Sequence, residues 1–264
     1  MECLDNRLKL ITLYLTILVS PVAIAQSIVF YTDQWAPYNY MVDNEIQGIS
    51  TDLIRAALAP TELSYQIKMR PWARAYLTVQ KTPNTALFTV NRSASREMSF
   101  KWVGPLLASN IYLFKLKENH FIKIKGLNDL KRYSVGVLRN GSVHSFLKNN
   151  GLPDDNMNLH SHAEQHIRML LAKRLDLVPG DEVDLKFQLK NRREEFYKME
   201  RACLLYRGAY YIAFNINTPD KLITQIQQAL DQALADGIRE EILSRYLFKE
   251  AALTTNGIER CIEN

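Results

Sequence analysis

The sequence contains little cysteine, glycine or proline, and it has no long apolar run after its N-terminal segment. Among 264 residues there are 3 Cys, 10 Gly and 9 Pro. This composition indicates that no flexible linker separates the two halves. A membrane-spanning helix needs about 18 or more consecutive apolar residues, and no such stretch follows the N-terminal segment.

An excess of charge of one sign is also absent. Lys and Arg total 33 against 28 Asp and Glu, which gives a formal net charge of +5. The basic residues are dispersed, apart from the cluster at 190–193, which is followed by Glu194 and Glu195. Such a mixed cluster is typical of a solvated helix face. We therefore expect no nucleic acid partner.

The N-terminus has the pattern of a secretory signal peptide. Arg7 and Lys9 precede an apolar stretch, and Ala-Ile-Ala at 23–25 provides a small-residue cleavage site. We expect residues 1–25 to be removed and the protein to be periplasmic. The mature chain, 26–264, is long enough for one large or two modest domains.

Only two cysteines remain in the mature chain. Cys3 leaves with the signal peptide, and Cys203 and Cys261 stay. In an oxidising compartment two cysteines favour a single disulfide. The alternative is a pair of unpaired buried thiols, because the distance between them is not encoded in their spacing.

We expect neither a metal nor a cofactor. The histidines form one cluster, at His160, His162 and His166, and Glu164 is the only thiol or carboxylate residue near them at ligand-like spacing. We interpret the cluster as the polar start of a helix.

Strands alternate with amphipathic helices along the mature chain, a pattern that favours parallel βαβ units and an α/β fold. The strongest helix, at 218–235, has apolar residues at helical spacing and ends at Asp236 and Gly237. A second set of elements follows the first, so the second set can form a lobe of its own. We expect strands at 28–32, 86–90, 133–138, 175–178 and 209–214, and helices at 51–59, 72–80, 142–149, 162–173 and 218–235.

The segment 86–105 is the most informative part of the chain. A short apolar strand, 86–90, leads into a polar turn that carries Asn91 and Arg96. Ligands in open α/β sheets bind at strand ends, and a guanidinium binds a carboxylate through two parallel hydrogen bonds. Arg96 is therefore a candidate carboxylate-binding residue. The alternative is a surface arginine that pairs with Glu97 or with nothing.

Six short motifs follow one another along the mature chain. They are Tyr-Thr-Asp-Gln-Trp-Ala-Pro-Tyr-Asn-Tyr at 31–40, Gln-Gly-Ile-Ser-Thr-Asp-Leu at 47–53, Ser-Ala-Ser-Arg at 93–96, the segment 130–141, Leu-Asp-Leu-Val-Pro-Gly-Asp-Glu at 175–182 and Leu-Ala-Asp-Gly at 234–237. In this order they resemble the periplasmic solute-binding proteins of the polar amino acid type, family 3 of the bacterial extracellular solute-binding proteins. Each motif is weak alone, whereas six in order are specific.

The resemblance implies a two-lobed clamp of type II, in which each lobe is a sheet flanked by helices. The first lobe would be discontinuous, 26–113 with 210–264, and 114–209 would form the second. Two hinge crossings would lie near 111–115 and 207–212. A ligand would bind between the lobes and draw them together.

The resemblance also implies a ligand site built from both lobes. Arg96 matches the residue that binds the ligand α-carboxylate, and Asp181 matches the acid that accepts its α-ammonium. A zwitterion needs one cation and one anion close together, which agrees with these two assignments. The other matched positions are Asp33, which can read the ligand side chain, Trp35, whose ring can stack on the ligand, the cleft-lining Thr89 and Asn91, and the second-lobe Ser142, which follows Asn140 and Gly141.

These positions also have purely structural interpretations. In those, Asp33 caps a turn, Trp35 packs against Pro37 and Asp181 is a helix N-cap. The chain also departs from the family at 70–74, where Arg-Pro-Trp-Ala-Arg is unusual and would place Trp72 or Arg74 at the edge of the cleft.

The function implied by the resemblance is non-catalytic. The protein would be a monomer that captures a small polar ligand, an amino acid or a related carboxylate, and presents it to the inner-membrane permease of an ABC importer. One alternative is an enzyme similar to cyclohexadienyl dehydratases, with Glu182, His144 or Asp33 as acid candidates, although their spacing indicates no acid–base pair. The other is a sensory module that docks onto a membrane receptor.

Overall fold

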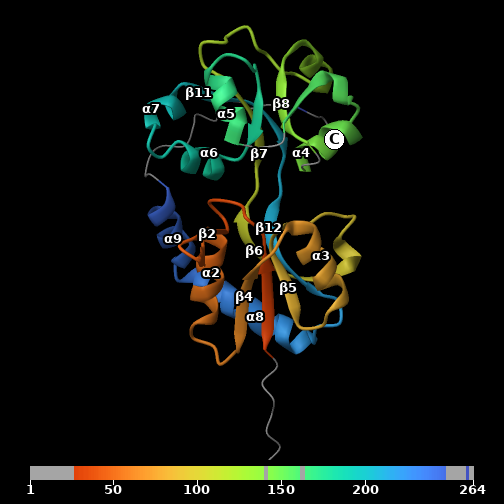
Figure 1. Ribbon diagram of the computed structural model, residues 1–264, viewed down its shortest axis with the longest axis vertical. Helices are drawn as coiled ribbons and strands as arrows, with labels where there is room; N and C mark the ends of the chain where they lie inside the picture. Colours follow the sequence, from red (N-terminus) through yellow and green to blue (C-terminus); the bar gives the residue numbers. More distant parts are fainter. Residues whose placement is uncertain (1–26, 140–141, 161–163, 248–259, 262–264) are drawn as a thin grey trace, which may run out of the picture.

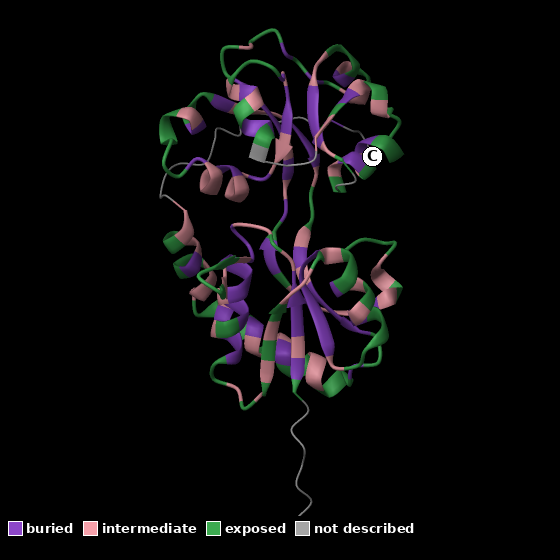
Figure 2. Cartoon of the chain, viewed as in Figure 1, coloured by how far each residue is buried: buried purple, intermediate pink, exposed green. Residues whose placement is uncertain are grey.

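A computed structural model of the protein describes residues 27–139, 142–160, 164–247 and 260–261. The expected signal peptide at 1–25 lies outside the described residues, and so does His162. The described chain forms two lobes stacked along the long axis and joined by extended segments (Figure 1). Strands run through the middle of each lobe and are largely buried (Figure 2). Within the described ranges, no helix is long and apolar enough to cross a membrane.

The first lobe, the lower one in Figure 1, contains a five-stranded sheet in the order β4-β1-β5-β12-β6. These strands are β1 (Ile28–Thr32), β4 (Tyr65–Met69), β5 (Thr85–Asn91), β6 (Phe100–Ala108) and β12 (Ala209–Asn215). The other first-lobe elements are the hairpin β2 (Tyr40–Val42) and β3 (Glu45–Gln47), the helices α2 (Ile49–Leu58), α3 (Trp72–Lys81), α8 (Asp220–Ala235) and α9 (Ile238–Tyr246), and the short 3-10 helix η1 (Glu97–Ser99).

The first-lobe sheet is mixed. β1 pairs in parallel with β4 and β5, as the sequence predicted for βαβ units. β12, however, runs antiparallel to both β5 and β6, so the prediction of parallel units is wrong for this half of the sheet. The reason is topological. The chain leaves the lobe at the end of β6 and returns to it at the start of β12, at the same end of the sheet, so these two neighbouring strands point in opposite directions.

Apolar residues of β5 pack into two hydrophobic cores, which lie on opposite faces of this sheet. Ala86 and Phe88 pack into the core covered by α2, α8 and α9, whereas Leu87 packs into the core covered by α3. Val90 also faces the α3 side, because a register shift opposite Thr89 reverses the alternation of side chains.

The second lobe contains an antiparallel sheet in the order β10-β7-β11 and a parallel pair, β8 with β9. An isolated bridge between Val135 and Leu177 links the two. The elements of the second lobe are β7 (Ile111–Leu116), η2 (Leu127–Arg132), β8 (Val135–Leu138), α4 (Ser142–Asn149), η3 (Asp154–Asn156), β9 (Met157–His160), α5 (Glu164–Leu171), β10 (Val178–Gly180), α6 (Glu182–Gln188), α7 (Arg193–Tyr197) and β11 (Met199–Tyr206). Together the lobes confirm the expected α/β clamp fold.

The chain passes between the lobes twice, at neighbouring points. β6 ends at Ala108 and β7 begins at Ile111, while β11 ends at Tyr206 and β12 begins at Ala209. The two connections are tied together, since Ser109 N–H donates to the Gly208 carbonyl at 2.9 Å. The first crossing therefore precedes the expected 111–115, because Ile111 and Leu113 already belong to the second-lobe sheet and core.

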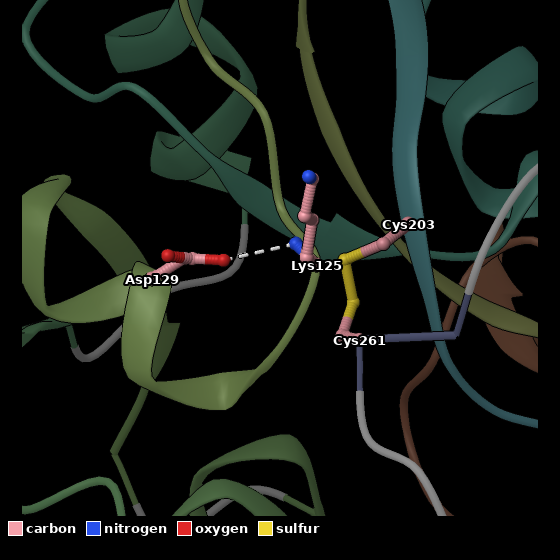
Figure 3. Close-up of a disulfide and its surroundings, with 4 residues drawn as sticks. All are labelled: Lys125, Asp129, Cys203 and Cys261. Carbon is pink, nitrogen blue, oxygen red and sulfur yellow. Dashed lines mark hydrogen bonds between the residues drawn. A yellow bond between two sulfur atoms is a disulfide. The ribbon is translucent and has the colours of Figure 1, made fainter.

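Cys203 of β11 is joined to Cys261 by a disulfide, with the two Cα atoms 5.3 Å apart (Figure 3). Both residues are fully buried, and Cys261 N–H donates to the Leu204 carbonyl at 2.9 Å. Arg260 and Cys261 consequently lie with the second lobe. This differs from the expected grouping of 210–264 with the first lobe, because the disulfide and the backbone bond hold these two residues on β11.

Replacing both cysteines by alanine should lower the free energy of unfolding by about 4 kcal/mol, because the bridge closes a loop over a sequence separation of 58. Denaturant unfolding of the parent and the double variant would measure the loss. Reductant should destabilise the parent and leave the double variant unchanged. Recovery of both cysteines as free thiols in non-reducing mass mapping of secreted protein would contradict the prediction.

Candidate ligand site

Arg96 lies in the turn between β5 and β6, where two rings and one carbonyl hold its guanidinium. Its Cζ is 5.7 Å from the ring centroid of Trp72 and 5.8 Å from that of Tyr76. Its Nη1 donates to the Asn91 carbonyl at 3.1 Å. Ring faces attract a guanidinium but do not accept its in-plane N–H donors as a carboxylate does. Most of the donors of Arg96 therefore remain for a further acceptor.

Glu97 pairs with Arg92 rather than with Arg96. Arg92 Nε and Nη2 lie 2.8 Å and 2.5 Å from the two carboxylate oxygens of Glu97. This hydrogen bonding lowers the pKa of Glu97 and raises that of Arg92. No carboxylate within the described ranges forms an ion pair with Arg96, so the alternative of a surface Arg96–Glu97 pair does not apply.

A second guanidinium, that of Arg70, rests on the same aromatic surface. Arg70 follows β4, where its N–H donates to the Thr32 carbonyl at 2.8 Å and its Cζ lies 4.8 Å from the Tyr31 ring centroid. Tyr31, Trp72 and Tyr76 belong to one apolar cluster. No ion pair of Arg70 occurs in the part of the chain that the structure describes. The sequence marked 70–74 as unusual but did not identify Arg70 itself; its position directly after a parallel strand was the available signal.

Thr89 and Asn91 occupy the end of β5. Thr89 is buried with φ at 63°, in the left-handed region that β-branched residues rarely adopt, and its Oγ1 has no hydrogen-bond partner among the described residues. Asn91 pairs with Tyr210 at the start of β12, beside the Gly208 crossing. Both expected cleft residues therefore lie next to the connection between the lobes.

Asp33 and Trp35 lie in the turn after β1. The Asp33 carbonyl accepts a hydrogen bond from Asn39 Nδ2 at 2.7 Å, and burial raises the pKa of the Asp33 carboxyl. The Trp35 ring packs edge to face on Tyr38 and Tyr210, with centroids 4.9 Å and 5.3 Å away. The packing of Trp35 therefore includes two tyrosines that the structural alternative, a contact with Pro37, did not name.

Trp35 also lines a cavity of about 740 Å³ between the lobes. Gln34 contributes from the first lobe, and Phe187, Gln188 and Asn191 contribute from the second. Neither Arg96 nor Asp181 lines this cavity. Of the expected site residues, Trp35 alone borders it, so this cavity does not include the turn that carries Arg96.

Asp181 is the N-cap of α6, and it also contacts the first lobe. Its Oδ1 accepts from Asp184 N–H at 2.7 Å, while its Oδ2 accepts from Tyr38 Oη at 2.7 Å and from Tyr210 Oη at 3.3 Å. Burial raises the pKa of Asp181, and burial with the nearby Asp181 charge raises the pKa values of both tyrosines. Its expected role toward an ammonium stays a prediction.

Ser142 begins α4 in the second lobe and is exposed. Its Oγ accepts a hydrogen bond from Tyr206 Oη at 3.4 Å. Asn140 and Gly141, which precede it, lie outside the described residues. The structure therefore places the Ser142 hydroxyl near the second crossing and gives no further contact for it.

Comparison with known proteins decides the family. The model of the bacterial extracellular solute-binding proteins, family 3, matches residues 28–250. The chain belongs to this family. None of the curated proteins compared with it matches.

Solved structures share the fold of this solute-binding protein at low identity. The arginine-, lysine-, histidine-binding protein ArtJ of Geobacillus stearothermophilus has 20% identity and a TM-score of 0.65, over 86% of this chain and 97% of that one. Substrate-binding domain 2 of Lactococcus lactis GlnP, in an open conformation, has 18% identity and a TM-score of 0.64, over 88% of this chain and 99% of that one. A histidine kinase sensor domain has 18% identity and a TM-score of 0.68, over 84% of this chain and 96% of that one. At such identities the likeness shows the fold alone.

Two of the residues considered as acids for an enzyme, Glu182 and His144, contact charged side chains within the second lobe. Glu182 pairs with Arg201 and, at 3.0 Å, with Lys186. His144 Nε2 lies 3.1 Å from Asp154. These contacts lie within the second lobe.

The histidines of this solute-binding protein form no metal site within the described ranges, where no group of three or more His, Cys, Asp or Glu residues gathers. His166 is buried in α5 with its ring centroid 5.1 Å from that of His160. Burial, with a contribution from His160, lowers the pKa of His166 to about 4. The expected polar helix start is therefore wrong for His166, because the helix turns this ring inward.

His166 should make the protein less stable in acid. Its folded pKa lies below the ordinary 6.5, so the stability that it contributes is complete above that pH and is lost as the pH falls toward 4. Between about pH 7 and about pH 4.5, His166→Gln should reduce the fall in unfolding free energy by about 1–2 kcal/mol. Urea unfolding at both pH values measures this, with His120→Gln, at an exposed position, as the control. A profile identical to that of the parent would refute it.

Proposed function

We propose that the protein binds a small solute carrying a carboxylate, between its lobes, and delivers it to an ABC importer. The observation that carries this proposal is the guanidinium of Arg96. It is held in place by Trp72, Tyr76 and the Asn91 carbonyl, and it has no carboxylate partner among the described residues. A guanidinium fixed in this way binds a carboxylate without first losing much conformational freedom.

Neighbouring groups support a polar ligand at this position. Thr89 has a buried hydroxyl without a partner in the described chain, and Asn91 carries an amide beside the crossing. Trp35 borders the cavity between the lobes and offers an apolar face. Together with Asp33 and Ser142 these are the side chains that we propose to line the ligand site.

The fold supports a mechanism in which binding acts by closure. The lobes are joined at two neighbouring crossings tied by one backbone hydrogen bond, so a small change at 109–110 and 207–208 moves one lobe as a unit. A ligand that contacts both lobes favours the closed form by the difference in its affinity for the two forms. The permease would then recognise the closed, loaded protein.

Arg96→Ala should weaken binding of the ligand by at least about 2 kcal/mol, or about 30-fold, because the carboxylate loses its charge-assisted hydrogen bonds. Arg96→Lys should restore only part of the loss, since an ammonium has no planar fork. A thermal-shift screen of amino acids and organic acids would identify the ligand, and calorimetry would give the affinities.

The matched control for this experiment is Arg132→Ala. Arg132 lies in η2 of the second lobe, and its side chain is 76% exposed. This substitution should leave affinity unchanged. Unchanged affinity in Arg96→Ala as well would remove Arg96 from the ligand site and with it the main support for the proposed function.

Delivery to an importer has a separate test. Cells of the source organism that lack the protein should lose uptake of the labelled ligand, and Arg96→Ala should fail to restore it. Normal uptake together with a lost transcriptional response to the ligand would instead indicate the sensory role.

A further inference from the structure

Arg96 and Asp181, the two charged residues expected to bind a zwitterion, differ in how far other groups of the protein already bind their charged ends. Both carboxylate oxygens of Asp181 accept hydrogen bonds from the protein itself, one from Asp184 N–H and the other from the hydroxyls of Tyr38 and Tyr210. The residue is only 6% exposed. An ammonium group at Asp181 therefore competes with donors that the protein itself supplies.

Packing opposes displacement of the tyrosine hydroxyls. Tyr38 is fully buried, and the rings of Trp35, Tyr38 and Tyr210 contact one another edge to face, with centroids 4.9–5.3 Å apart. On the side of the second lobe, Val183 follows closely after Asp181 and packs against the core of the first lobe. The tyrosine hydroxyls are consequently held against the carboxylate from both lobes.

The guanidinium groups of Arg96 and Arg70, unlike the carboxylate of Asp181, remain available to a ligand. Arg96 rests on Trp72 and Tyr76, and Arg70 rests on Tyr31 of the same cluster. Neither guanidinium forms an ion pair with a carboxylate in the described chain. Apart from Asp33, which is partly buried and whose pKa burial raises, the residues proposed to line the ligand site offer positive charge without a free negative charge, which suits an anion better than a zwitterion.

We propose that the ligand is an organic acid without an α-ammonium group, and that Tyr38 and Tyr210 exclude amino acids by occupying Asp181. This inference rests on the proposed binding of a carboxylate at Arg96. Asp181 then joins the two lobes instead of contacting the ligand. An amino acid has to break a buried hydrogen bond or leave its ammonium beside the guanidinium groups, so it should bind at least about tenfold more weakly than its deaminated analogue.

Matched pairs of probes test the proposal by calorimetry. Suitable pairs are propionate with L-alanine, succinate with L-aspartate, glutarate with L-glutamate, 3-phenylpropionate with L-phenylalanine and 5-guanidinopentanoate with L-arginine. Within the pair that binds, the parent protein should prefer the acid without the ammonium group. Tighter binding of the amino acid overturns the inference.

Two variants test the cause of that preference. Tyr38→Phe and Tyr210→Phe remove one hydroxyl each and keep the ring, so each should raise the affinity for the amino acid and reduce the ratio between the pair. Tyr246→Phe is the matched control. The Tyr246 hydroxyl likewise donates to a carboxylate at 2.7 Å, but that carboxylate is Asp52 of the first lobe. A ratio unchanged in both Tyr38→Phe and Tyr210→Phe overturns the assignment of specificity to them.

Failure of this inference is distinguishable from failure of the proposed function. If amino acids bind more tightly and their binding requires Arg96, carboxylate recognition stands and only the exclusion of ammonium is wrong. If no probe of either series binds, or if binding is the same in Arg96→Ala, the proposed function is wrong and the inference falls with it.

Discussion

One buried carboxylate, that of Asp181, accepts hydrogen bonds that cross the contact between the lobes. Removing a carboxylate from water costs several kcal/mol unless hydrogen bonds replace its hydration. Asp181 receives one such bond from its own helix and two from tyrosines that pack in the first lobe. This requirement holds the start of α6 against the first-lobe core, and Trp35 shares the arrangement because it packs on the same tyrosines.

The arginines of the first lobe follow a different physical rule. A guanidinium is weakly hydrated and always charged, so ring faces can hold it without a carboxylate. Arg92 has both rings and Glu97, whereas Arg96 and Arg70 contact rings without a carboxylate partner in the described chain. The fold positions this turn, whereas the binding that we propose depends on these few side chains. A likeness at 18–20% identity therefore shows the scaffold and leaves the ligand to these side chains.

Much of the fold was predictable from local pattern. The strands at 28–32 and 86–90 and the helix at 218–235 differ from β1, β5 and α8 by at most two residues at either end, because their apolar spacing reflects burial directly. Among the elements that were not predicted are β4, β6, β7, β9, β11 and α9. α9 has only one buried residue, Ile242, which leaves little apolar periodicity, and the direction of β12 followed from the path of the chain through the other lobe.

The sequence by itself determined the family, the two cysteines available for pairing and the candidate role of Arg96, since each rests on residue identity and order along the chain. Only the tertiary structure decided that Glu97 pairs with Arg92, that Arg70 joins Arg96 on one aromatic cluster, and that Asp181 is satisfied by tyrosines. For the contact between Asp181 and the tyrosines, the physical reason is distance along the chain. Tyr38 and Asp181 are separated by 143 residues, and a hydrogen bond over that separation exists only once both lobes have folded and met.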